Sequence, residues 1–144
     1  MPQDSKISLK VSRRYAAAPE RVFDAWLDPK TVGKWLFATP NGQMIRVEID
    51  ARVGGQFTIV RREGDDIEHV GEYLEIDRPR RLVFTFGVPK FSAEMTRVTV
   101  EIAPAGQGCE LTLTHDGVLP EWAERTQSGW GMILDGLENH LARG

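Results

Sequence analysis

The sequence predicts an α+β fold in which a curved antiparallel sheet of about seven strands surrounds a long C-terminal helix. Two observations predict it. The helical and strand patterns are segregated along the chain, as one strand, two short helices, six strands and one long helix. The segment from Pro120 to Leu141 has a helical period, whereas the stretch between Met44 and Asp116 alternates apolar and polar residues. Because a twisted antiparallel sheet of this size tends to curl, we expect the helix to lie on its concave side.

The N-terminal part predicts one strand followed by two helices. Apolar residues at every second position predict a strand from Ile7 to about Tyr15. Pro19 suits the first turn of a helix, which Asp28-Pro29 interrupts, and Asp28 can cap a second, short helix. The apolar faces of these two helices consist of Val22, Phe23, Trp26, Leu27, Val32, Trp35 and Leu36.

Six further strands are predicted after these helices. Residues 45–49 and 57–59 indicate a hairpin with Gly54-Gly55 between its strands. Alternating segments separated by short turns then cover residues 69–76, 81–88, 95–102 and 109–115. Consecutive strands with such short connections are typical of an antiparallel meander.

The last helix carries one continuous apolar stripe. From Trp130, apolar residues recur at plus three, plus four, plus seven and plus eleven. The stripe must cover the inner face of the sheet, and the space between helix and sheet is the predicted ligand site. Gly129 and Gly136 lie at one edge of the stripe, where missing side chains permit close packing, room for a ligand or a shift of the helix.

Composition and charge exclude several classes of function. The chain has 144 residues, which we interpret as a single domain, 1–144. Its 18 basic and 21 acidic residues give a net charge of -3 without a basic block, so nucleic acid is not an expected partner. Cys109 has no second cysteine to pair with and the N-terminus lacks an apolar segment, which predicts a cytoplasmic protein. No apolar run reaches the roughly 20 residues that span a bilayer, so membrane insertion is not expected.

Motifs for metal, phosphate or nucleophilic chemistry are absent from the sequence. The histidines at positions 69, 115 and 140 belong to no HxH, HExxH or CxxC pattern, which argues against a metal site. Gly54-Gly55 opens no phosphate-binding motif, and Cys109 stands at a strand start without a GxSxG context. We therefore expect neither a metal nor a cofactor, and we assign no catalytic residue.

Several ordered segments carry a resemblance to a known family. They are AAAPERVFDAWLDPKTVGKWL, RVGGQFTI, GEYLEIDRPRRLVFTF, VTVEIAPAGQGCELTLTHDG and GWGMILDGLENHL. Together they resemble the START-like or SRPBCC superfamily, in particular its branch related to activators of the heat-shock-chaperone ATPase, over residues 7–142. The resemblance implies a helix-grip fold with a deep, largely apolar cavity under the C-terminal helix. In the superfamily such cavities hold lipids, sterols, polyketides, plant hormones or aromatic compounds.

Three polar side chains are candidates for the polar end of such a cavity. His115 shares a strand face with Leu111 and Leu113, so it either faces the cavity or is a strand-end histidine bonded to the backbone or to its neighbour. Glu72 is in register with apolar positions of its strand, and Arg61 of the preceding strand is a candidate partner. Either residue can instead reach water at the margin of the sheet.

Large apolar residues complete the predicted pocket, although the pattern does not separate those that line it from those that fill the core. Thr126 lies toward the apolar side of the last helix and presents a hydroxyl to the same space. The candidate pocket residues are Trp35, Phe37, Phe57, Arg61, Glu72, Phe84, Phe86, Met95, His115, Thr126, Trp130 and Ile133.

Three hypotheses for function follow. The first is binding of a small apolar or aromatic ligand under the last helix. The second is an enzyme of the same shape, such as an aromatase, cyclase, dehydratase or hydrolase, using His115, Glu72 or Arg61. The third, implied by the resemblance, is a chaperone partner or stress-response protein, although only about six residues precede the first strand whereas eukaryotic activators carry a further N-terminal domain. An exposed outer strand is compatible with either a monomer or a homodimer.

Overall fold

The strands of the computed structural model form one curved antiparallel sheet, and the structure describes residues 6–39, 41–91 and 94–142. Within these residues, the sheet has seven strands in the order β1-β7-β6-β5-β4-β3-β2. Strands β2 to β7 form a meander, and β1 pairs with β7. The strands are β1 (Ile7–Tyr15), β2 (Gln43–Ile49), β3 (Gln56–Glu63), β4 (Asp65–Asp77), β5 (Arg81–Phe86), β6 (Thr96–Ala105) and β7 (Gly108–Val118). The predicted meander and the hairpin of β2 and β3 are confirmed.

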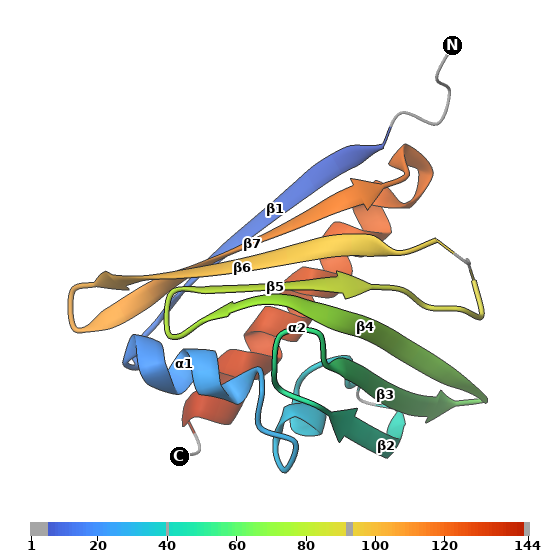
Figure 1. Cartoon of the computed structure of the whole chain (residues 1–144), viewed down its shortest axis with the longest axis horizontal. Helices are drawn as coiled ribbons and strands as arrows, with labels where there is room; N and C mark the ends of the chain where they lie inside the picture. Colours follow the sequence, from blue (N-terminus) through green and yellow to red (C-terminus); the bar gives the residue numbers. More distant parts are fainter. Residues whose placement is uncertain (1–5, 40, 92–93, 143–144) are drawn as a thin grey trace.

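Helices connect and cover this sheet. The long helix α2 (Ala123–Ala142) crosses the strands obliquely, and α1 (Pro19–Ala25) lies near its C-terminal end (Figure 1). Two single 3₁₀ turns, η1 (Val32–Lys34) and η2 (Pro120–Trp122), precede β2 and α2 respectively. The predicted second helix is thus reduced to one turn, and Asp28 Oδ1 accepts a hydrogen bond of 2.9 Å from the Lys30 backbone N–H at its approach.

The apolar stripe of α2 packs into the concave face of the sheet. Trp130, Leu134, Leu137 and Leu141 are its buried side chains, and they share one core with the inner faces of the strands and with α1. The Tyr15 hydroxyl of β1 donates a hydrogen bond of 2.9 Å to the carbonyl oxygen of Leu134. This bond joins the middle of α2 to the edge strand. None of the described helices combines the length and apolar character needed to cross a bilayer.

The face of strand β4 that points into the core is the one opposite to the face that its sequence pattern predicts. His69 and Tyr73 point into the core, whereas Glu72 is exposed and Leu74 is 42% exposed. Gly71 stands between the two buried residues, because a Cβ there would meet the ring of Phe57. The prediction of an inward Glu72 is therefore wrong.

Candidate functional site

A groove opens between the N-terminal half of α2 and the strand ends beneath it. It consists of two cavities of about 350 and 330 Å³, which share Phe86, Val88, Arg125 and Thr126 and so lie side by side. We call them the inner lobe and the outer lobe of the helix groove. The inner lobe reaches Phe37 and the strands β3 and β4, and the outer lobe reaches the end of β7 and η2. Each volume falls within the range of small-ligand sites, roughly 300 to 1,000 Å³.

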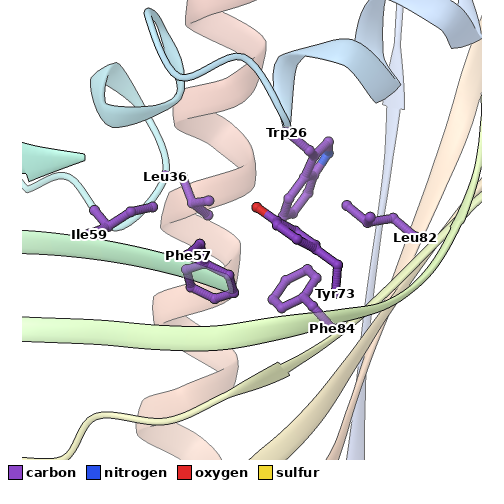
Figure 2. A pocket seen from close by; sticks show the side chains of 7 residues that line it. All are labelled: Trp26, Leu36, Phe57, Ile59, Tyr73, Leu82 and Phe84. Carbon is purple, nitrogen blue, oxygen red and sulfur yellow. The ribbon is translucent and has the colours of Figure 1, made fainter. Parts of the chain in front are cut away.

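The interior beside α1 is filled by side chains. Seven apolar and aromatic residues surround a cavity of about 10 Å³, and Figure 2 shows their side chains converging, with the Tyr73 hydroxyl directed among them. These residues are Trp26, Leu36, Phe57, Ile59, Tyr73, Leu82 and Phe84. A space of this size holds one water molecule at most. The predicted pocket residues Phe57 and Phe84 are therefore part of the packed core.

Aromatic rings form the floor of the inner lobe. The ring of Phe37 lies 4.4 Å from the ring of His69 at an interplanar angle of 8°, and 5.1 Å from the ring of Phe86 at 14°. The indole of Trp130 meets Phe86 edge-on at 6.2 Å. These rings stack on one another and give the inner lobe an apolar, aromatic floor.

Phe37 reaches this position through an unusual backbone conformation. Its φ is +60°, in the left-handed region that residues other than glycine, asparagine and aspartate seldom occupy. Arg61 Nη1 donates a hydrogen bond of 3.0 Å to the Phe37 carbonyl oxygen and so holds the turn between η1 and β2. The sharp turn places the ring against His69 of β4 and Phe86 of β5. Retained backbone strain of this kind is typical of functional sites.

His115 lies at the junction of α2, β6 and β7, where both of its ring nitrogens are used. Trp130 Nε1–H donates to Nδ1 at 2.9 Å, and Nε2 lies 2.6 Å from Thr96 Oγ1. The Thr96 hydroxyl is in turn 2.9 Å from the Phe86 carbonyl oxygen, which can only accept. The order of donors fixes His115 as the neutral tautomer with hydrogen on Nε2. Burial lowers the pKa of His115 to about 4, so the ring stays neutral near pH 7.

His69 keeps one ring nitrogen for a ligand. Its Nδ1 lies 3.0 Å from the Ile59 carbonyl oxygen and donates to it, which leaves Nε2 as an acceptor. Burial, assisted by the charge of Arg61, lowers the pKa of His69 to about 4. No described residue bonds to Nε2, and the ring lines the inner lobe. This nitrogen can accept a hydrogen bond from a ligand hydroxyl.

Two arginines bring positive charge to the groove. Arg125, on the first turn of α2, lines both lobes, and its guanidinium carbon lies 5.2 Å from the ring centroid of Trp122. Arg61 lines the inner lobe, and its Nε is 3.6 Å from Glu63 Oε1. Because Glu72 points outward, the predicted pairing of Arg61 with Glu72 is wrong.

The structure brings together seven of the twelve predicted pocket residues. They are Phe37, Arg61, Phe86, His115, Thr126, Trp130 and Ile133. Trp35 is buried against the edge of Trp26, at 4.8 Å between ring centroids, and lies in the core. Met95 is 47% exposed, precedes β6 and covers Gly87 from outside, so it does not line the groove. The sequence predicts that Met95 lines the pocket because the pattern makes it the first residue of a strand. It lies in the connection before β6, where the alternation of inward and outward side chains does not apply.

Among the lining residues that the sequence did not single out, Arg125 and His69 carry the polar chemistry of the groove, and each had a usable signal. Arg125, Gly129 and Ile133 recur at intervals of four, so they share one face of α2. His69, Gly71 and Tyr73 stand at every second position of β4, so they share one face of this strand. Among the residues that the structure describes, no cluster of three or more histidine, cysteine, aspartate or glutamate side chains is arranged to hold a metal ion.

The family is decided by a match over most of the chain. The family model described as "Activator of Hsp90 ATPase homolog 1-like protein" matches residues 16–142. The chain belongs to this family. The resemblance inferred from the sequence is thereby confirmed, and the seven-stranded sheet around a long C-terminal helix agrees with the helix-grip fold of this Hsp90-activator-homolog family.

Solved structures of bacterial proteins share this fold. Protein CV1439 from Chromobacterium violaceum is 28% identical, with 96% of each chain covered and a TM-score of 0.84. Mll3558 from Rhizobium loti is 25% identical, with 94% of this chain and 96% of that chain covered and a TM-score of 0.80. SA2116 from Staphylococcus aureus, described as a protein of unknown function, shares the fold at 16% identity, with 94% and 93% covered and a TM-score of 0.84. No curated protein matches the sequence significantly.

Proposed function

We propose that this member of the Hsp90-activator-homolog family binds a small apolar or aromatic molecule in the helix groove. The observation that carries the proposal is the pair of adjoining cavities of about 350 and 330 Å³ beside an otherwise packed core. A cavity of this size beneath an amphipathic helix forgoes packing that would stabilise the fold. A bound ligand restores those contacts.

The chemistry of the walls supports an aromatic ligand. Phe37, Phe86 and Trp130 give the inner lobe aromatic walls, and His69 Nε2 offers one hydrogen-bond acceptor beside them. Few polar groups among apolar walls are typical of sites that orient a small organic molecule. An enzymatic role is less well supported, because both nitrogens of His115 are engaged within the protein.

The experiment uses the neutral dye N-phenyl-1-naphthylamine, whose fluorescence rises in apolar surroundings. We expect saturable binding to the wild-type protein and its loss in Gly129→Leu. A Cβ at Gly129 meets no atom within 4 Å, so the new side chain enters the groove without disturbing the helix. Gln127→Leu is the matched control, because position 127 is exposed on α2 and does not line either lobe.

Two results would contradict the proposal. One is the absence of saturable dye binding together with no stabilisation by a panel of fatty acids, sterols and aromatic polyketides in thermal unfolding. The other is equal dye affinity in Gly129→Leu and Gln127→Leu, which would place the dye elsewhere.

The family description favours a second candidate function, stimulation of a chaperone ATPase in the cytoplasm. That function needs an exposed recognition surface, and Phe91, Trp122 and Met132 are exposed apolar side chains at the rim of the groove. The test is the ATPase rate of the host's Hsp90-type chaperone with and without the protein. An unchanged rate, with no complex in sedimentation, would remove this candidate.

A further inference from the structure

We propose that the ligand of the helix groove is an aromatic organic anion whose acidic group is held by Arg125 and Arg61. The inference rests on the proposed binding function and names the chemical class of the ligand. It depends on the two arginine side chains that line the groove and on the partners that each of them has.

Arg125 is the first observation. Its side chain stands where the two lobes meet, and it is exposed to the groove. No carboxylate among the described residues pairs with it, and its guanidinium instead faces the ring of Trp122 at 5.2 Å. Stacking on an aromatic ring leaves the edge of a guanidinium and its N–H groups available to a carboxylate.

Arg61 is the second observation, because its guanidinium is only partly satisfied, with Nη1 bonded to the Phe37 carbonyl oxygen. Its side chain is only 17% exposed, and its buried Nε has no hydrogen-bond partner. The nearest carboxylate oxygen, Glu63 Oε1, is 3.6 Å away and accepts a hydrogen bond of 2.8 Å from the Thr39 hydroxyl. A buried N–H of a cation that lacks a partner is costly, and a second anion nearby reduces this cost.

Glu63 offsets part of the charge of Arg61, and no described carboxylate offsets the charge of Arg125. Among the described lining residues the acidic group is Glu94, which forms an ion pair of 2.8 Å with Lys6. His69 and His115 also face the groove, and both are neutral near pH 7. The protein as a whole carries a net charge of -3, yet its groove presents two guanidinium groups. This excess of positive charge beside aromatic faces fits an anion with a flat apolar body.

The experiment compares two ligands that differ in charge and hardly in shape. Naphthalene-2-carboxylate and naphthalene-2-carboxamide compete with N-phenyl-1-naphthylamine for the groove, and the inhibition constants are measured in the wild type and in variants. We expect the carboxylate to bind about tenfold more tightly than the carboxamide, because charge-assisted hydrogen bonds are the stronger ones. Added salt should weaken the carboxylate alone.

Arg125→Gln is the principal variant, because this exposed side chain can change without loss of the fold. We expect it to remove most of the preference for the carboxylate over the carboxamide, a ratio of two inhibition constants that is measured within the same protein. Arg61→Gln should act in the same direction. Arg52→Gln removes the same charge from a side chain that is 77% exposed and outside both lobes, and it should keep the wild-type preference.

The outcomes separate the two proposals. If the dye binds, but the carboxylate and carboxamide compete equally or Arg125→Gln and Arg61→Gln both retain the preference, the anionic class is wrong and the binding function stands. If the dye fails to bind the wild type and no member of the ligand panel stabilises it, the binding function itself is wrong.

Discussion

The indole N–H of Trp130 on α2 donates a hydrogen bond of 2.9 Å to Nδ1 of His115 on β7. Trp130 is 3% exposed and His115 is 3% exposed, so the bond lies in the wall between groove and core. His115 then donates to Thr96, whose hydroxyl donates to the Phe86 carbonyl oxygen. This chain of donors attaches the long helix to three strands, and the side chains of Phe86 and Trp130 at its two ends line the inner lobe.

We predict that Trp130→Phe lowers the free energy of unfolding by about 2 kcal/mol, because a buried acceptor at His115 loses its donor. The same change should raise the pKa of His115, since the N–H donated to Nδ1 favours the neutral ring. Urea denaturation measures the first effect and a nuclear magnetic resonance titration of the imidazole measures the second.

Trp122→Phe is the control for this substitution. Trp122 is 42% exposed, so we expect a change within about 0.5 kcal/mol. Equal destabilisation by the two variants, or an unchanged pKa of His115 in Trp130→Phe, would show that the hydrogen bond from Trp130 to His115 does not stabilise the fold as predicted.

Acid should destabilise the protein through His69 and His115. Burial lowers the pKa of each from 6.5 to about 4. As the pH falls from 6.5 to 4, both histidines become protonated in the unfolded chain but remain neutral in the folded protein. The free energy of unfolding that they contribute above pH 6.5 is therefore lost toward pH 4. Each histidine contributes on the order of 3 kcal/mol to this loss.

The measurement is the urea midpoint between pH 7 and pH 4.5. The double variant His69→Gln, His115→Gln should show a shallower decline than the wild type, with each single variant between them. A decline as steep in the double variant as in the wild type would assign acid sensitivity to carboxylates instead.

The sequence was sufficient to predict the order of elements, and it was insufficient to predict which aromatic residues remain unpacked. Strand and helix periods are local properties, so the meander and the stripe of α2 could be identified from neighbouring residues. Phe84 and Phe86 share one strand face and are equivalent in the pattern, yet Phe84 lies in the packed core and Phe86 lines the groove. The difference arises from Trp26 and Leu36, which follow α1 and η1 and pack around Phe84 but do not line the groove at Phe86.

The sequence was also insufficient to predict which face of β4 points inward and which backbone conformation Phe37 adopts. Alternation in β4 gave the correct period but not the inner face, because that face carries His69 and Gly71 while Val70 and Leu74 point outward. No local signal marked Phe37 for a positive φ, since that conformation depends on distant contacts with Arg61 and the aromatic floor.

The strained backbone at Phe37 predicts that a glycine variant is more stable than an alanine variant, which is the reverse of the usual order. Glycine normally destabilises a chain relative to alanine by about 0.5 to 1 kcal/mol, but at a φ of +60° alanine retains the strain that glycine releases. We therefore expect Phe37→Gly to be more stable than Phe37→Ala by about 0.5 to 1 kcal/mol, although both lose the ring. Urea denaturation of the two proteins decides it, and a more stable alanine variant would show that residue 37 relaxes to negative φ.

Two glycines predict opposite effects of the same added methyl group. At Gly129, inside α2, a Cβ meets no atom within 4 Å, so Gly129→Ala should raise the free energy of unfolding by about 0.5 to 1 kcal/mol through helix propensity. At Gly71 a Cβ overlaps the Thr85 carbonyl oxygen and the Phe57 ring, so Gly71→Ala should lower it by about 1 to 3 kcal/mol.

Stability and dye affinity measured on both variants test why Gly129 is tolerated within a helix. The proposed ligand site requires Gly129→Ala to gain stability while its affinity for the naphthylamine dye falls, because the methyl group occupies the inner lobe. Gly71→Ala is the control, since this position lies outside both lobes. If Gly129→Ala gained stability with undiminished dye affinity, the open space at this glycine would have no part in binding.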